Sequence, residues 1–349
     1  MRVRPAALWC ALVLGCAGLP PATARCLSDC TPRIGIVSAF GAEADLLVAQ
    51  TRQARTRTVN GNRFTTGVLR GRRVVIVLSG VSMVNATMVT QLMLDHFRIE
   101  RLVMSGIAGG VNPAHRVGDV TVPERWVMPM EVYWNGEARL PSACGVPGDL
   151  ACLGLALARQ PDGTPWPPYQ TWYLRQNFVM TAANAPQGEY RFDYPVDAEM
   201  LAVARSLRPP LQRCGPRART AQGGIDDPQC VKAQPTLVVG GTGVSGTAFL
   251  ANADYRRYLF DTLGAQVVEM ETAALAHVAL ANRVPYIAMR SVSDLAGAQD
   301  LHADAVALFT SGLAEANAAA VTLSFLEAWS AHQASKRRAV RPAPPPARR

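Results

Sequence analysis

Short, continuously apolar segments that alternate with longer helix-like segments limit the fold of this chain more than any other feature. Continuous apolar runs are typical of strands that are buried on both faces of a sheet, and regular alternation with helices is typical of parallel sheets. The predicted strands cover residues 33–39, 63–69, 73–80, 101–110, 236–241, 266–270 and 286–294. The predicted helices cover residues 82–97, 253–264, 271–283 and 302–331. We therefore expect an α/β fold in which helices flank a mostly parallel sheet.

A single domain can account for the length of the chain. The 349 residues are 49% hydrophobic, which is enough to bury a sizeable core. Regular alternation occupies residues 33–128 and 236–329, and an irregular segment rich in Cys, Pro and Trp separates these blocks. We interpret residues 25–334 as one domain, with residues 129–235 as a loop-rich insertion pinned by disulfides rather than a second domain.

The N-terminal residues have the pattern of a segment for export. Two arginines precede an apolar stretch from Ala6 to Leu19, and an A-x-A cleavage pattern ends at Ala24. The stretch is shorter than the roughly 20 residues that span a bilayer as a helix, so we expect no stable membrane span. We predict a signal peptide over residues 1–24 and a periplasmic or secreted protein. A lipoprotein anchored through Cys16 is the alternative.

The cysteine count agrees with export. Six cysteines remain after the predicted signal peptide, and an even number in an oxidising compartment is typical of disulfides. Proximity along the chain favours three pairs: Cys26 with Cys30, Cys144 with Cys152, and Cys214 with Cys230. No CxxC pair and no HxxxH spacing occurs in the sequence, so we expect no metal site and no cofactor.

The formal net charge of +9 is concentrated at the two ends of the chain. Two positive charges lie in the predicted signal peptide and six lie in residues 335–349, which leaves +1 for the body. A nearly neutral body argues against nucleic acid as a partner. The segment 335–349, SKRRAVRPAPPPARR, offers little to bury, so we expect a disordered, basic, Pro-rich tail.

A glycine pattern at residues 238–246, VVGGTGVSG, has the GxGxxG spacing of dinucleotide-binding loops. Such a loop needs its third glycine to open a helix, but Asn252 or Asp254 is a better helix cap than Gly246. The helix would then begin too late to direct its N-terminus at a phosphate. We interpret the glycines as a tight turn at the edge of the sheet, with no dinucleotide bound there.

Four carboxylates follow or end predicted strands: Glu43, Glu269, Glu271 and Asp294. Ligands of open α/β sheets bind at the carboxyl ends of the strands, so these side chains are candidates for a functional site. Each of them could instead cap the helix that follows it, where free N–H groups stabilise a negative charge.

Five longer segments contain these carboxylates and occur in a fixed order. They are RIGIVSAFGAEADLL, SGVSMVNATMVTQLMLDHF, MSGIAGGVNPAHRVGDVTVP, VSGTAFLAN and VVEMETAALAHVALANRVPYIAMRSVSD. Together they resemble the purine nucleoside phosphorylase and nucleosidase superfamily, and most closely its 5′-methylthioadenosine/S-adenosylhomocysteine nucleosidases. The resemblance implies a single-domain, three-layer α/β fold with a central mixed, mostly parallel sheet. It also implies a homodimer or a larger homo-oligomer.

The resemblance implies three catalytic residues. Asp294 would protonate the purine at N7 as the base leaves, and Ser293 would hold its carboxyl group. Glu43 would be the general base for the attacking water, and Arg290 would help to position that water.

The resemblance also implies how substrate is bound. Glu271 would grip the ribose hydroxyls, Phe249 would stack on the purine, and the backbone of Leu250 would hydrogen-bond the edge of the base. The further residues implied to bind substrate are Met270, which would pack against the sugar, Ile107 and Gly109.

The sequence lacks the features that bind phosphate in the related phosphorylases. It has AFGAE at residues 39–43 in place of a GDPxR-type segment, and VMSG at 103–106 without a preceding arginine. Ile107 and Thr247 also depart from the nucleosidases, which have a serine and an aspartate there. We expect an exported purine nucleosidase for an adenosine-type nucleoside, methylthioadenosine-like or adenosine, acting in nucleoside breakdown and purine salvage. The alternatives are a purine or uridine-type nucleoside phosphorylase and a non-catalytic protein that binds or stores nucleosides.

Overall fold

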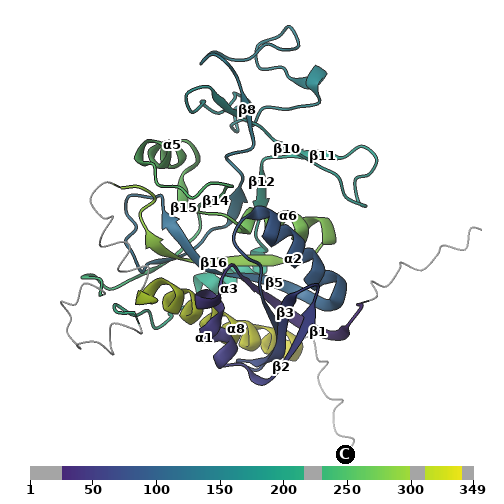
Figure 1. Ribbon diagram of the computed structural model, residues 1–349, viewed down its shortest axis with the longest axis vertical. Coiled ribbons are helices and arrows are strands. Elements are labelled where there is room, and N and C mark those ends of the chain that lie inside the picture. The colour runs from purple at the N-terminus through teal and green to yellow at the C-terminus, as the bar shows by residue number, and fades with distance from the viewer. Residues whose placement is uncertain (1–25, 216–229, 299–310, 340–349) are drawn as a thin grey trace, which may run out of the picture.

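The computed structural model describes residues 26–215, 230–298 and 311–339 (Figure 1). The predicted signal peptide, including Cys16, lies outside the described residues. Within them, no helix has both the length and the apolar character needed to cross a bilayer.

A twelve-stranded sheet forms the centre of the molecule. Its strands are β1 (Asp29–Ser38), β2 (Arg52–Val59), β3 (Asn62–Leu69), β4 (Arg72–Leu78), β5 (Phe97–Gly110), β6 (Val120–Val122), β7 (Arg125–Val127), β12 (Asp193–Pro195), β13 (Leu237–Val239), β14 (Thr242–Ser245), β15 (Ala265–Glu269) and β16 (Tyr286–Asp294). The main order is β12-β7-β14-β15-β5-β1-β4-β3-β2, and β16 pairs with β5 and β6. Strands β4, β1, β5 and β16 run parallel, whereas β2, β3 and β4 form an antiparallel meander. The predicted mixed, mostly parallel sheet is confirmed.

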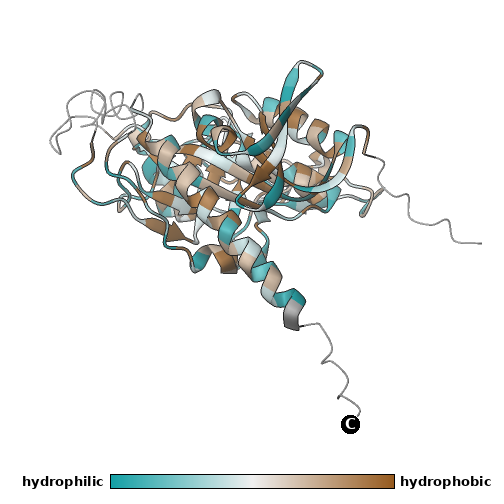
Figure 2. Ribbon diagram, turned by 90° about the horizontal axis from the view of Figure 1, so that it is seen from below, coloured by the Kyte–Doolittle hydropathy of each residue, from teal (hydrophilic) through white to brown (hydrophobic). Residues whose placement is uncertain are grey.

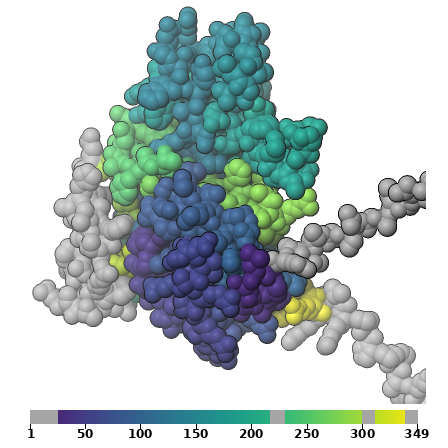
Figure 3. Space-filling model, turned by 45° about the vertical axis from the view of Figure 1, so that its right-hand side comes forward, coloured from purple at the N-terminus to yellow at the C-terminus, as the bar shows by residue number. Residues whose placement is uncertain are grey.

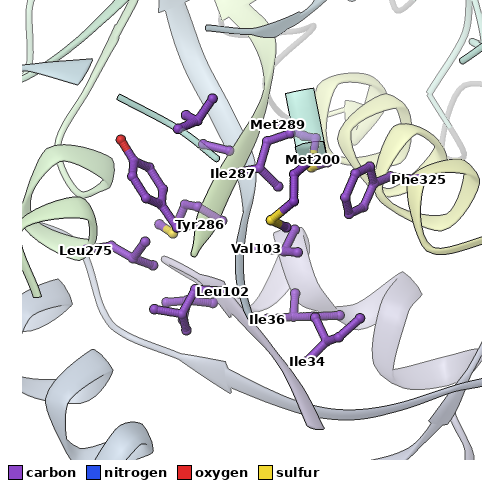
Figure 4. Close-up of a cluster of buried hydrophobic side chains, with 14 of the residues drawn as sticks. Ile34, Ile36, Leu102, Val103, Met200, Leu275, Tyr286, Ile287, Met289 and Phe325 are labelled. Carbon is purple, nitrogen blue, oxygen red and sulfur yellow. The ribbon is translucent and has the colours of Figure 1, made fainter. Parts of the chain in front are cut away.

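Helices cover both faces of this sheet and complete the predicted three layers. They are α1 (Gly41–Ala49), α2 (Met83–His96), α3 (Ala198–Arg205), α5 (Ala253–Leu263), α6 (Thr272–Asn282) and α8 (Leu313–Ala339). Helix α8 packs with α1 and α3, while α2 packs with α6. Figure 4 shows how alternate strand residues serve the two faces, since Leu102 points toward Leu275 of α6 and Val103 lies on the side of Phe325 of α8.

The segment 129–235 contains a projecting part and a part that belongs to the main layers. The projecting part holds the hairpin of β8 (Val132–Trp134) with β9 (Trp172–Leu174), the short helix η1 (Ala151–Leu153), and the hairpin of β10 (Asn177–Val179) with β11 (Glu189–Arg191). It stands out from one end of the molecule (Figures 1 and 3). Strand β12 extends the central sheet. Helix α3 buries the apolar side chains of Met200 and Ala204 in the main core.

All three predicted cysteine pairs are bonded: Cys26 to Cys30, Cys144 to Cys152 and Cys214 to Cys230. The predicted boundary between helix and tail is wrong, because α8 continues through residues 335–339, and its last turns extend beyond the layers (Figure 2). Residues 340–349 lie outside the described residues. The beginning of the predicted helix 302–331 lies outside them too.

Only part of the glycine pattern forms a turn. Gly243 lies inside β14, which pairs with β7 and β15 within the sheet, so the interpretation as a turn at the edge of the sheet is wrong for that residue. Gly240 and Gly241 have φ values of 120° and 75°, a backbone region that favours glycine. Helix α5 begins only at Ala253, where the side chain of Asn252 accepts a hydrogen bond from the Tyr255 N–H at 2.8 Å. The free N–H groups of this helix therefore lie well past Gly246, and the interpretation against a dinucleotide loop holds.

Candidate active site

A pocket of about 160 Å³ opens where β5, β15 and β16 end. Nine of the ten predicted site residues line it: Glu43, Ile107, Gly109, Phe249, Leu250, Met270, Glu271, Ser293 and Asp294. The tenth, Arg290, has no exposed surface and lies behind the carboxylates. Residues more than 250 positions apart in the sequence therefore meet at one edge of the sheet, as the strand-end argument predicts.

Asp294 ends β16 with both carboxyl oxygens held. The Ala296 N–H donates to Oδ1 at 2.8 Å, and the Ser293 hydroxyl donates to Oδ2 at 2.9 Å. A Cβ on Gly109 would lie 3.0 Å from Oδ1, tighter than most real contacts. Glycine at position 109 therefore leaves the space in front of the Asp294 carboxyl open to the pocket.

Glu43 lies in the first turn of α1 and is buried. One carboxyl oxygen accepts the Ile107 N–H at 2.8 Å, and the other accepts the N–H groups of Ala39 and Phe40. Burial raises the pKa of Glu43, and these donors together with the Arg290 charge offset only part of that rise. A carboxylate with a raised pKa is a stronger base, which suits it to take a proton from water.

Arg290 joins three carboxylates from three elements. Its guanidinium forms ion pairs with Glu269, with Glu271 at 3.3 Å and with Glu43 at 3.7 Å. Burial alone would lower the pKa of Arg290, but the three carboxylates raise it above its ordinary value. A Cβ on Gly106 would collide with both Arg290 and Glu43, so glycine at that position lets the cluster close against β5.

Glu269 is the member of this cluster to which the sequence assigned no role. It accepts hydrogen bonds from Ser245, from the backbone N–H of Thr272 and from the Thr272 hydroxyl. It therefore does what the capping alternative proposed for these carboxylates, at the start of α6, and it also holds Arg290. The sequence feature that could have pointed to Glu269 is its ExE spacing with Glu271 at the end of a strand.

Glu271 is a second site carboxylate whose pKa is raised. It accepts the Ser82 N–H at 2.9 Å and faces Arg290. Burial and the neighbouring Glu269 charge raise its pKa to about 7, against the lowering effects of Arg290 and the Ser82 bond. Ser82 has a φ of 92°, which is unusual for a residue with a side chain, and this conformation aims its N–H at Glu271.

This shift predicts that Glu271 lowers the stability of the protein as the pH rises. Between its ordinary pKa of 4.5 and the folded value of about 7, the folded protein binds more protons than the unfolded chain, so folding is favoured at the acidic end. The difference corresponds to about 3 kcal/mol. Urea unfolding of the protein and of Glu271→Gln at pH 5 and pH 8 measures it. The free energy of unfolding of Glu271→Gln should increase relative to the parent as the pH rises. Glu137→Gln, an exposed change, should have the same stability as the parent at both pH values.

The side of the pocket formed by Phe249 and Leu250 is apolar and open. Phe249 is 73% exposed, on the loop between β14 and α5, and its ring borders the pocket beside Leu250. An exposed ring at a pocket mouth is available to stack on a flat heterocycle. No group of three or more metal-ligating side chains occurs among the described residues.

An α/β domain with a mixed sheet, and with a carboxylate-lined pocket where its strands end, defines the nucleoside phosphorylase-like class of protein. The family model of the Phosphorylase superfamily matches residues 33–327, and the chain belongs to that family. The resemblance stated from the sequence is thereby confirmed.

Known relatives within the family are nucleosidases. The 5′-methylthioadenosine/S-adenosylhomocysteine nucleosidase of Psychromonas ingrahamii is 25% identical over 265 residues, which cover 76% of this chain and 87% of the relative. The solved structure of the Neisseria meningitidis nucleosidase of that name, in complex with methylthio-immucillin-A, has a TM-score of 0.56 at 19% identity and covers 86% of this chain and 99% of that one. The futalosine hydrolase of Helicobacter pylori has a TM-score of 0.53 at 19% identity, covering 88% and 98%. These structures share the fold.

Proposed function

We propose that this protein is an exported hydrolase that cleaves the N-glycosidic bond of an adenosine-type nucleoside, methylthioadenosine-like or adenosine, to free purine and sugar. Asp294 is the acid at purine N7, Glu43 is the base for water, and Glu271 binds the ribose hydroxyls. The relatives named above, which are nucleosidases, support the reaction class.

The charge of the pocket lining carries this proposal. Among the described residues, the charged side chains that line the pocket are all acidic: Glu43, Glu269, Glu271 and Asp294. The nearest cation, Arg290, is fully buried and held by three of them. This lining would repel a doubly charged phosphate and offers it no free arginine. A neutral nucleoside and water would not be repelled. Hydrolysis is therefore favoured over the alternative of phosphorolysis.

The contacts of Ser293 suit a carboxyl group that gives up a proton. Its hydroxyl has one hydrogen but two acceptors within reach, Asp294 Oδ2 at 2.9 Å and the Ala108 carbonyl at 3.3 Å. When Asp294 is protonated, the Ser293 oxygen can accept a hydrogen bond from its carboxyl group while the Ser293 hydroxyl donates to the Ala108 carbonyl. When Asp294 has protonated the base, Ser293 can turn and donate to the new carboxylate. Both states of the acid are thus hydrogen-bonded.

Three buried carboxylates beside the sugar would stabilise the positive charge that develops as the bond breaks. Glu271 would hold the ribose hydroxyls and Met270 would pack against the ring. Phe249 and Leu250 would hold the purine. Because a binding or storage protein has no need for a base with a raised pKa opposite a second carboxyl group, we place that alternative behind catalysis.

The proposal is tested by chromatography of the products from adenosine, inosine and methylthioadenosine, with and without phosphate. Purine and free sugar in amounts independent of phosphate are expected. Phosphate-dependent sugar 1-phosphate would establish a phosphorylase instead. Tight binding without product from any nucleoside would establish the binding protein.

Glu43→Gln is expected to lower kcat by about 10²-fold. Glutamine keeps the hydrogen bond from Ile107 but cannot take a proton from water, while departure of the base remains assisted by Asp294. Initial rates of purine release measure the effect, with Gln50→Glu at the exposed end of α1 as a control for changes in that helix. A rate within twofold of the parent would exclude Glu43 as the base.

The site of action and the assembly also belong to the proposal. Three disulfides are compatible with a periplasmic or secreted location, for which the N-terminal pattern is the sequence support. Val84 and Met88 expose 76% and 54% of their surface on α2, next to Val81 at the pocket. Exposed apolar side chains beside a site support a homo-oligomer that covers this face.

A further inference from the structure

We propose that the β2 edge of the central sheet is a docking surface for the phosphate groups of an anionic lipid membrane. The surface consists of seven arginines on β2, β3, β4 and their turns, which we name the arginine edge: Arg52, Arg55, Arg57, Arg63, Arg70, Arg72 and Arg73. The sequence has no acidic residue between Asp45 and Asp95. Within the described chain, Arg70 is the one of the seven with an ion pair, to Glu327.

A β-bulge gathers three of these side chains on one face. Arg52, Arg55 and Arg57 pair with Val68, Thr66 and Phe64 of β3, which are alternate residues and so point the same way. The bulge between Arg52 and Arg55 adds the residue that makes this possible, since without it the two side chains would point to opposite faces.

Two local features hold the bulge in place. Gln53 adopts a φ of 54°, in the left-handed region that residues with a side chain rarely enter. A Cβ on Gly67, on the partner strand, would collide with Thr51 and lie 2.7 Å from the Arg52 carbonyl. Glycine at position 67 therefore lets the bulged strand approach, and the row of arginines depends on both positions.

The arginine edge gives the molecule an uneven distribution of charge. The body carries a net charge of +1, so the seven arginines leave −6 for the remainder. Strand β2 is exposed along almost its whole length, and Arg72 lies within electrostatic range of Glu100 and of two further arginines, Arg101 and Arg337 on α8. The near-neutral body, which argued against a polyanionic partner in the sequence, thus conceals a segregated positive surface.

Phosphate groups at a flat surface fit this edge better than nucleic acid. Guanidinium groups bind phosphate in bidentate fashion, and the cations of the edge are all arginines. The large exposed aromatic side chains of the described residues, Trp134, Phe178, Tyr190 and Phe249, lie outside β2–β4, so the edge offers no ring on which a base could stack. The predicted export also places the chain beside membranes.

The position of the edge leaves the pocket accessible. Arg72 and Arg73 begin β4, and Arg52 lies on the same rung across β3. The other end of β4 leads to Val81 at the pocket. Arg57 lies at that end, level with Phe64 and Val77, but β3, β4 and β1 separate β2 from the strands that end at the pocket. A protein held by its arginine edge would therefore still present the pocket to solvent.

Co-sedimentation with vesicles tests this proposal. The protein, purified from an exporting host, is mixed with vesicles of phosphatidylcholine alone or with added phosphatidylglycerol, at low and high salt. We expect the protein to bind the anionic vesicles and high salt to reverse this binding. The triple variant R52Q/R55Q/R57Q should bind them with about 100-fold weaker affinity, because each arginine contributes roughly tenfold or less at a membrane surface. The matched control R116Q/R139Q/R257Q loses the same charge elsewhere on the surface and should bind like the parent.

Three results would overturn it. Equal binding to neutral and anionic vesicles would mean that apolar insertion, not charge, is responsible. Equal weakening in both triple variants would mean that net charge alone matters. Binding to duplex DNA in the same assay, without binding to vesicles, would assign the edge to nucleic acid. Nucleoside cleavage in solution should be unchanged in both triple variants, which also shows that they fold.

Discussion

Replacing Asp294 with asparagine should lower kcat by at least about 10³-fold, the larger part of what a positioned general acid contributes. Asparagine has the same shape, and its amide oxygen can still accept the Ala296 N–H that now holds Oδ1 at 2.8 Å. It has no acidic proton to give to purine N7, so the base would have to leave as an anion. Affinity for the nucleoside should stay within a few-fold of the parent, since the Phe249 ring and Glu271 are untouched.

Two measurements separate these effects for Asp294→Asn. Single-turnover release of purine reports the chemical step, and equilibrium dialysis with the same nucleoside reports binding. Asp261→Asn, an exposed change on α5, is the matched control and should retain full activity. Near-normal turnover by Asp294→Asn would remove Asp294 from the mechanism, whereas loss of binding in proportion to activity would make it a substrate ligand instead.

The candidate site could be predicted from the sequence because it depends on local rules. Glu43 follows β1 and Asp294 ends β16, and the carboxyl ends of these strands share one edge of the sheet because both run parallel to β5. Glu271 follows β15, which runs antiparallel to β5, so the strand-end rule alone does not place it there. Cysteine pairs separated by few residues close small loops, which is why proximity was enough for Cys144 with Cys152.

The arrangement of Arg290 could not be predicted in the same way. Its partner Glu269 ends β15, which runs antiparallel to β5, while Arg290 itself lies on β16, parallel to β5. Their meeting depends on long-range pairing that no local pattern encodes. The resemblance implied an arginine that helps to position the water, and the three ion pairs of Arg290 with Glu43, Glu269 and Glu271 could not be read from the sequence.

The arginine edge was missed for a related reason. The net charge of the body adds positive and negative residues together, so it does not show that they lie on different parts of the surface. The row formed by Arg52, Arg55 and Arg57 also depends on a bulge, so the simple alternation of a strand would have divided these residues between two faces. The helical residues 335–339 were assigned to the tail on composition, although a helix packed at its start can continue into polar sequence.

Arg290→Met should destabilise the folded protein by about 3–5 kcal/mol at pH 8, as expected when one partner of a buried charge cluster is removed. Methionine fills much of the same volume, so the effect comes from three buried carboxylates, Glu43, Glu269 and Glu271, that lose the cation they share. The pKa of Glu43 and of Glu271, already raised, would rise further because Arg290 is a cause that lowers both. Glu271, whose pKa is about 7 even with Arg290 present, would then be protonated at pH 5 in the folded variant.

The sign of the pH effect distinguishes charge from packing. A carboxyl group whose folded pKa exceeds its unfolded value binds more protons when folded, so the variant should regain stability as the pH falls from 8 to 5. Urea unfolding at both pH values measures this, with Arg205→Met at an exposed ion pair as the control, for which less than about 1 kcal/mol is expected at either pH. An equal loss for Arg290→Met at pH 5 and pH 8 would mean that Arg290 stabilises the fold by packing. Recovery at pH 5 would mean that Arg290 stabilises the fold by its charge, which offsets the negative charges of Glu43, Glu269 and Glu271.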